Sequence, residues 1–189
     1  MKRDHRYYSI FSNTTAPSEI RTVMYRVAAS LADKGYVQRS GGNSVEKPFI
    51  SGATILSGSE QKSKIMLPWD GFGDQRIGSG NYVGNQKLAQ QMAKRYLKGF
   101  NRLKPEQRLI VARQVYVLLG KELKQHSEFL LCYTDDGATS HIDTKNKSFE
   151  FILRLASNYG IRVFNFRNDQ DLAMATAWLE RIDTHAVSH

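Results

Sequence analysis

Short apolar runs alternate with amphipathic segments along this sequence, and this alternation restricts the fold more than any other feature. The apolar runs have the length and the aromatic or β-branched content of buried strands. The five predicted strands are residues 7–11, 36–39, 64–67, 129–133 and 161–166. Segments with apolar residues at helical spacing separate them. Strands that alternate with helices predict an α/β fold, in which helices cover both faces of a parallel sheet.

The helical segments have recognisable ends. Pro17 suits the first turn of a helix, and Gly35 suits the position after its last turn. One predicted helix begins at Pro17 and is closed by Gly35, and a second ends near Ser57. Four further helices are predicted at residues 86–98, 105–119, 148–158 and 169–182. Because crossover connections are right-handed, we expect a Rossmann-like, five-stranded parallel sheet in the order 3-2-1-4-5. The length of 189 residues suits a single domain over 1–189.

Residues 70–85 are rich in glycine and polar side chains and show no periodicity. We expect a long loop there, and we expect it to be the most mobile internal region. Loops of this length in compact domains are often functional. The carboxyl ends of parallel strands usually surround the ligand site. The loops after Phe11, Arg39, Leu67 and Tyr133 should therefore surround any site.

Positive charge is concentrated in one segment. The chain has a formal net charge of +9, and residues 86–125 contain ten Lys or Arg side chains but only Glu106 and Glu122 as acids. Such a field attracts phosphate groups of nucleic acid or nucleotides, or an acidic protein. A solvated helix face is the alternative interpretation. The expected basic surface consists of Lys94, Arg95, Lys98 and Arg102.

Other features argue against several classes of protein. The only cysteine, Cys132, lies in an apolar run and excludes an internal disulfide, which fits a reducing cytoplasm. No apolar run approaches the roughly 18 residues of a membrane span, and no signal peptide is expected. His141 with Asp143, and His185 with His189, do not form a convincing metal pattern. We therefore expect no metal, no cofactor and a cytoplasmic protein.

Four segments together resemble one protein family. They are PSEIRTVMYRVAASLADKGYVQRSGG, KIMLPWDGFG, ARQVYVLLGKELKQHSEFLLCYTDDG and LASNYGIRVFNF. The series resembles the SLOG superfamily of Rossmann-like proteins, especially phage and bacterial members similar to DNA-processing protein A and related to the Lonely Guy phosphoribohydrolases. The resemblance extends from Tyr7 to about Phe166. It implies a phosphate site at the strand ends, built from three glycine-rich turns whose backbone amides contact the anion.

This sequence departs from the family pattern at each turn. The first reads Ser9-Ile10-Phe11-Ser12-Asn13, the second keeps Ser40, Gly41 and Gly42 before Asn43, and the third reads Thr144-Lys145-Asn146-Lys147-Ser148. Phe11 either fills the pocket or offers a face for stacking, and the lysines can bind an anion through their side chains. The site is thus either remodelled or lost. The residues that the resemblance assigns to it are Phe11, Ser12, Asn13, Arg39, Ser40, Gly41, Gly42, Asn43, Arg113, Lys145 and Lys147.

The expected function follows from these departures. Glu46 and Glu150 lack the spacing of the family's catalytic carboxylate, so we expect no catalytic residues. The resemblance implies non-catalytic binding of a nucleotide-derived ligand or of single-stranded nucleic acid. It also implies a phage accessory protein for DNA handling or counter-defence, in the host cytoplasm. The alternatives are a module that docks on an acidic host protein and, in third place, a nucleotide phosphoribohydrolase. Self-association into a homo-oligomer is left open.

Overall fold

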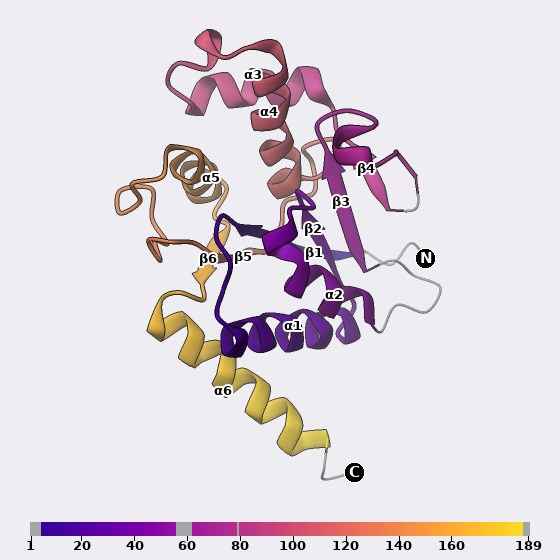
Figure 1. The fold of residues 1–189 in the computed structure, drawn as a ribbon, viewed down its shortest axis with the longest axis vertical. Coiled ribbons are helices and arrows are strands. Elements are labelled where there is room, and N and C mark those ends of the chain that lie inside the picture. Colours follow the sequence, from indigo (N-terminus) through magenta and orange to yellow (C-terminus); the bar gives the residue numbers. More distant parts are fainter. Residues whose placement is uncertain (1–4, 56–61, 79, 187–189) are drawn as a thin grey trace.

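One parallel sheet of six strands forms the centre of the protein. The computed structural model describes residues 5–55, 62–78 and 80–186 (Figure 1). The strands are β1 (Arg6–Ser12), β2 (Tyr36–Ser40), β3 (Ser63–Leu67), β4 (Asn81–Val83), β5 (Phe129–Tyr133) and β6 (Arg162–Asn165). Their order is β4-β3-β2-β1-β5-β6, and all pairs are parallel. The predicted Rossmann-like α/β class and the order of the five predicted strands are confirmed.

The predicted number of strands was wrong. The sixth strand, β4, lies within residues 70–85, where a loop was expected, and it pairs with the outer side of β3. A three-residue strand is too short to show a hydrophobic period, and its pairing with β3 stabilises it. The same segment contains the short helix η2 (Phe72–Asp74), and Ser79 is outside the described residues. The expected mobility of this segment stays a prediction.

Three helices pack on each face of the sheet (Figure 1). One face is covered by α1 (Ser18–Asp33), α2 (Lys47–Ile55) and α6 (Asp169–Ala186). The other is covered by α3 (Gln86–Tyr96), α4 (Pro105–Leu119) and α5 (Lys147–Asn158). The short helices η1 (Ser44–Glu46) and η3 (Phe100–Arg102) precede α2 and α4. Ser57, the expected end of α2, is outside the described residues.

Alternate residues of β1 divide the core in two. Tyr8 and Ile10 pack with α1, α2 and α6, whereas Phe11 packs with α4 and α5. The helix that follows β1 and the helix that follows β5 thus cover opposite faces. In an open parallel sheet, ligands bind at the crevice that such a change of direction leaves at the carboxyl ends of the strands. The ends of β1 and β5 are therefore the first place to look for a site.

Candidate functional site

The crevice between β1 and β5 is closed by the protein's own side chains. Asn13 Nδ2 donates a hydrogen bond of 2.9 Å to Asp135 Oδ1, and the amide of Asp135 donates one of 3.1 Å to Asn13 Oδ1. Below this pair, the buried ring of Phe11 stacks on Phe149 with centroids 5.0 Å apart. Phe11 is therefore part of the hydrophobic core, with its ring against that of Phe149.

The second glycine of the retained pair has a conformation that other residues do not fit. Gly42 has a φ of +75°, and a Cβ at this position would lie 2.7 Å from Cγ2 of Ile65. The amide of Gly42 donates to Ser40 Oγ at 3.3 Å, and the amide of Asn43 donates to Glu46 Oε2 at 3.2 Å. The turn therefore needs glycine for its own geometry, whether or not a ligand binds.

Glu46, Arg113 and Ser12 form a buried polar cluster beside this turn. Glu46 is 1% exposed and Arg113 is 4% exposed. Arg113 Nη1 donates to the carbonyl of Gly41 at 3.1 Å, whereas Arg113 Nε and Ser12 Oγ have no partner among the described residues. Burial raises the pKa of Glu46 to about 7, against the opposing effects of the Asn43 amide and the Arg113 charge. Burial likewise lowers the pKa of Arg113, and Glu46 opposes that change.

The third turn is also satisfied internally. The Asp136 carboxylate accepts hydrogen bonds from the hydroxyls of Thr134 and Thr144 and from the amides of Ala138 and Lys145. Burial alone would raise the pKa of Asp136, but these hydrogen bonds hold it below its ordinary value. At the start of α5, Asn146 Oδ1 accepts from the amides of Ser148 at 3.0 Å and Phe149 at 3.1 Å.

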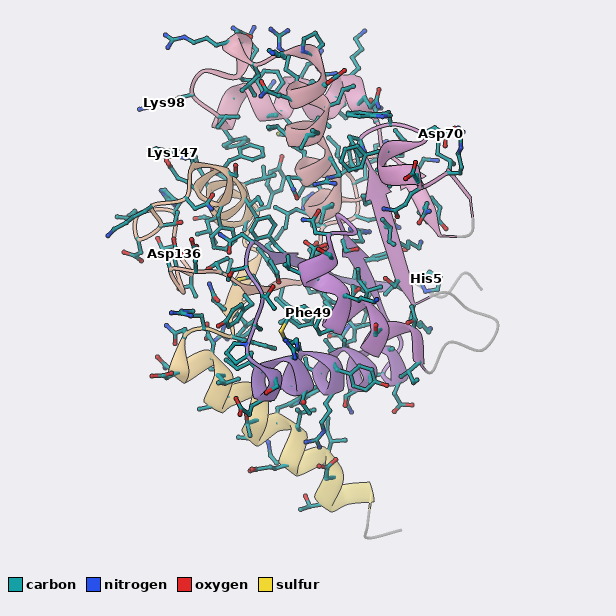
Figure 2. All side chains as sticks on the ribbon, in the orientation of Figure 1. His5, Phe49, Asp70, Lys98, Asp136 and Lys147 are labelled. Atoms are coloured by element: carbon teal, nitrogen blue, oxygen red, sulfur yellow. The ribbon has the colours of Figure 1, made fainter. Side chains whose placement is uncertain are left out.

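Lys145 and Lys147 lie on the surface of the third turn and the start of α5. Both are exposed, and Lys147 lies 3.4 Å from the Glu150 carboxylate. Figure 2 shows Lys147 on the outer side of α5, pointing away from the sheet. The expected arrangement, with these lysines across the site from the glycines, stays a prediction.

The backbone amides of these turns, which would contact a phosphate in a glycine-rich cradle, thus donate hydrogen bonds to side-chain oxygens of the protein itself. They belong to Asn13, Ser40, Glu46, Asp136 and Asn146. An anion at the strand ends would have to displace these acceptors, and one of them, the ionised Asp136 carboxylate, repels it.

The side chain of Arg39 does not join the other predicted site residues. It lines a cavity nearer the amino ends of the strands. This basic pocket has a volume of about 460 Å³. It lies between β1 to β4 and the segment that follows α4. Its lining consists of Tyr7, Arg39, Lys64, Met66, Tyr82, Lys121, Glu122, Lys124 and Gln125.

Arg39 forms the inner wall of the basic pocket. Its guanidinium carbon lies 3.8 Å from the centroid of the Tyr7 ring, and Nη1 donates to the carbonyl of Gln125 at 2.6 Å. Burial lowers the pKa of Arg39 to about 10, so the group stays charged at neutral pH. Lys64 Nζ lies 5.3 Å from the Tyr7 ring centroid and 5.5 Å from that of Tyr82. Cations and aromatic faces therefore alternate around the cavity.

Two parts of this geometry were missed in the sequence. The buried Glu46 ends the stretch Asn43-Ser44-Val45-Glu46, whose spacing is that of a capping box, and the structure shows this box at η1. That signal was visible. Lys64 carries no local signal, because the basic pocket is formed by strands and a loop that are distant in sequence.

The predicted basic surface lies where α3 ends and the chain turns through η3 into α4. Lys94, Arg95, Lys98 and Arg102 are exposed, and none of them forms an ion pair with a residue in the described ranges. Lys98 lies at the edge of the molecule in Figure 2. Elsewhere in the same ranges, no three His, Cys, Asp or Glu side chains gather as a metal site, and no helix is long and apolar enough to cross a membrane.

The fold places the protein in the Rossmann-like α/β class, and comparisons with known proteins add little to this. No protein-family model matches the sequence, and no curated protein matches it. One solved structure, the molybdenum cofactor binding protein from the phototrophic bacterium Rippkaea orientalis, is 12% identical. The alignment covers 94% of this chain and 99% of that chain with a TM-score of 0.40. A likeness of this strength carries no information about function.

Proposed function

We propose that the protein binds a nucleotide-derived, phosphate-bearing small molecule in the basic pocket and catalyses no reaction on it. The basic pocket itself is the observation that carries the proposal. Arg39, Lys64, Lys121 and Lys124 line it against one carboxylate, that of Glu122. Its volume of about 460 Å³ is within the range of small-molecule sites. Four cations attract phosphate, and the rings of Tyr7 and Tyr82 offer faces for a base.

The environment of Arg39 supports an anionic ligand. A buried guanidinium loses its hydration, and in this structure the Gln125 carbonyl and the Tyr7 ring replace only part of it. A phosphate in the pocket would add charge-assisted hydrogen bonds of about 1–3 kcal/mol each.

We further propose that the chain is a SLOG-type protein whose phosphate cradle at the strand ends no longer binds a ligand. Its own side chains accept hydrogen bonds from the backbone amides there. Anion binding has moved to the amino-terminal half of the sheet. Capture of a nucleotide signal by a phage protein in the host cytoplasm is the biological role that this resemblance suggests.

Calorimetry with AMP, ADP and adenosine tests the proposal. The nucleotides should bind and adenosine should bind more weakly, because it lacks phosphate. Lys64→Gln and Lys124→Gln should each weaken AMP binding by about 1–3 kcal/mol, the range for charge-assisted hydrogen bonds. Mass spectrometry of ligand released from the purified protein would identify the natural molecule.

Lys145→Gln combined with Lys147→Gln is the matched control, because these exposed lysines lie at the abandoned cradle. The control should bind AMP as the wild type does. If it loses binding while the pocket variants keep it, the strand-end site operates and the proposal is wrong. Gly42→Val is unsuitable as a test, because the added side chain would clash with Ile65.

The exposed cations of α3, of η3 and of the segment between them favour a second candidate function, the binding of single-stranded nucleic acid. These four side chains supply a phosphate-attracting face without a base-reading motif. An acidic host protein is the competing partner for the same face, and a pull-down from lysate in the presence of nuclease separates the two. Release of free base from nucleoside monophosphates is expected to be undetectable.

A further inference from the structure

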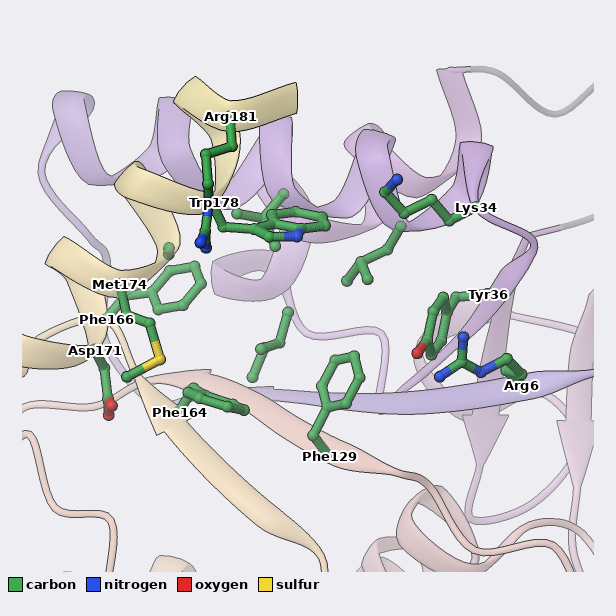
Figure 3. Close-up of a pocket in the computed structure, with 14 residues that line it drawn as sticks. Arg6, Lys34, Tyr36, Phe129, Phe164, Phe166, Asp171, Met174, Trp178 and Arg181 are labelled. Atoms are coloured by element: carbon green, nitrogen blue, oxygen red, sulfur yellow. The ribbon is translucent and has the colours of Figure 1, made fainter. Parts of the chain in front are cut away.

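A second cavity lies on the opposite face of the sheet, between α1 and α6 (Figure 3). This aromatic cavity has a volume of about 420 Å³. Phe129 of β5 and Phe164 of β6 contribute to its sheet side. Figure 3 shows the ring of Trp178, from α6, across the space from these two phenylalanines. Two helices and the sheet thus enclose a space with rings on opposite sides.

Water is a poor occupant of this space. At about 30 Å³ per molecule, roughly 14 waters would be needed to fill it. The inner walls consist mainly of apolar side chains, among them Leu31 and Leu131, which offer those waters no hydrogen bonds. Transfer of apolar surface out of water is favourable, so a ligand with an apolar body would displace them.

The rim of the cavity carries polar groups of mostly positive charge. Lys34, just after α1, and Arg181 of α6 lie on it. Arg6 is also there, but Glu128 pairs with it at 2.8 Å. The one carboxylate in the lining, that of Asp171, accepts a hydrogen bond from the amide of Asn165. The lining therefore holds three cations against one carboxylate, and because Glu128 offsets Arg6, the charge that remains at the mouth is positive.

The size of the cavity selects the class of occupant. An α-helix with its side chains is about 10 Å across, so even two turns exceed this volume. A small ring system fits, and the opposed aromatic walls favour a planar one. We infer that the aromatic cavity binds a small aromatic monoanion, with its rings between Trp178 and Phe129 and its charge toward Lys34. This inference is independent of the proposed function, which concerns the other face.

Fluorescence titration with 8-anilinonaphthalene-1-sulfonate tests the inference, with its uncharged analogue N-phenyl-1-naphthylamine as a matched probe. We expect saturable binding of one sulfonate per chain and quenching of Trp178 emission by energy transfer. The uncharged analogue should bind about 3- to 10-fold more weakly, since a partly exposed charge contributes about 1 kcal/mol. Lys34→Glu should weaken sulfonate binding to a similar extent. Lys87→Glu, on the far helix α3, should not.

A filling variant tests the location. Ala175→Phe places a ring inside the cavity and should reduce sulfonate affinity at least about tenfold, because the space is lost. If that variant does not fold, Met174→Glu replaces it. Met174 is 38% exposed at the cavity, and a carboxylate there should repel the probe. The double change Lys64→Gln with Lys124→Gln should leave sulfonate binding unchanged.

Three results would overturn the inference. They are an absence of saturable binding, equal binding to the wild type and the cavity variants, and loss of binding when only the basic pocket is changed. None of these results bears on AMP binding, so failure of this inference and failure of the proposed function are distinguishable.

Discussion

At the scale of single residues, Glu46 is the most constrained side chain at the strand ends. It accepts a hydrogen bond from the turn that the glycine pair makes, and it lies beside Arg113 with 1% of its surface exposed. Its pKa of about 7, against an ordinary 4.5, means that the folded protein favours the protonated acid. The free energy of unfolding therefore depends on the ionisation of this one carboxyl group.

The direction of that dependence follows from the raised pKa. The stability that protonated Glu46 contributes is fully present below about pH 4.5 and is lost as the pH rises through about 7, a total of about 3 kcal/mol. Glu46→Gln resembles the protonated acid. The unfolding free energy of the variant should therefore rise relative to the wild type by up to about 3 kcal/mol between pH 4.5 and pH 8.

Urea unfolding at several pH values measures this difference. Glu106→Gln, which removes an exposed carboxylate in the first turn of α4, is the matched control. If the difference in unfolding free energy between Glu46→Gln and wild type stays constant with pH, Glu46 has the same pKa in the folded and the unfolded chain.

At the scale of elements, Asn146 determines how α5 begins. Its side-chain oxygen accepts from two of the first amides of the helix. Asn146→Ala should lower the free energy of unfolding by about 1 kcal/mol, the usual effect of losing an N-cap. Asn146→Asp keeps an acceptor and places a negative charge at the helix N-terminus, so it should be as stable as the wild type. Equal stability of the alanine variant in urea would mean that water satisfies these amides equally well.

The elements that the sequence predicted well are those with strong local signals. The helix Pro105–Leu119 was predicted with its observed ends, because Pro105 and Gly120 delimit it. The order of the five predicted strands followed from the alternation with helices. The short strand β4 has no comparable signal, because its pairing with β3 defines it.

The candidate site was less predictable, because its geometry depends on contacts between distant segments. The sequence predicted that Ser12, Gly41, Gly42 and Asn43 lie together, and in the structure they lie around Glu46 and Arg113. It did not indicate that Arg39 faces away from them, which follows from its partner Gln125, 86 residues away. Nor did it indicate that Asp135 bonds to Asn13.

At the scale of the whole molecule, positive charge lies mainly on the layer of α3 and α4. If this face binds single-stranded nucleic acid, log affinity should fall linearly with log salt concentration, by about 0.7 per phosphate contacted. Lys94→Glu with Arg95→Glu and Lys98→Glu should weaken binding to a dT oligonucleotide and reduce that slope by about 2. Fluorescence anisotropy at several salt concentrations measures both quantities.

The reversal of Lys145 and Lys147 to Glu is the control for this experiment, since both lysines are exposed and belong to α5 and the turn before it, outside the predicted basic surface. It should leave the slope nearly unchanged. Affinity for the oligonucleotide that is the same at low and at physiological salt would rule out the electrostatic account.

The central position of β1 has a consequence for how the protein is made. One side of β1 meets β2, but its other side waits for β5, and the bonded residues Asn13 and Asp135 are 122 positions apart. At about 5–20 residues per second, the ribosome needs roughly 6–25 s to synthesise that interval. Throughout this time the emerging chain holds a strand with one unpaired backbone edge, and such an edge is a template for pairing with other chains. The nascent protein is therefore most exposed to misassembly before its fifth strand leaves the ribosome.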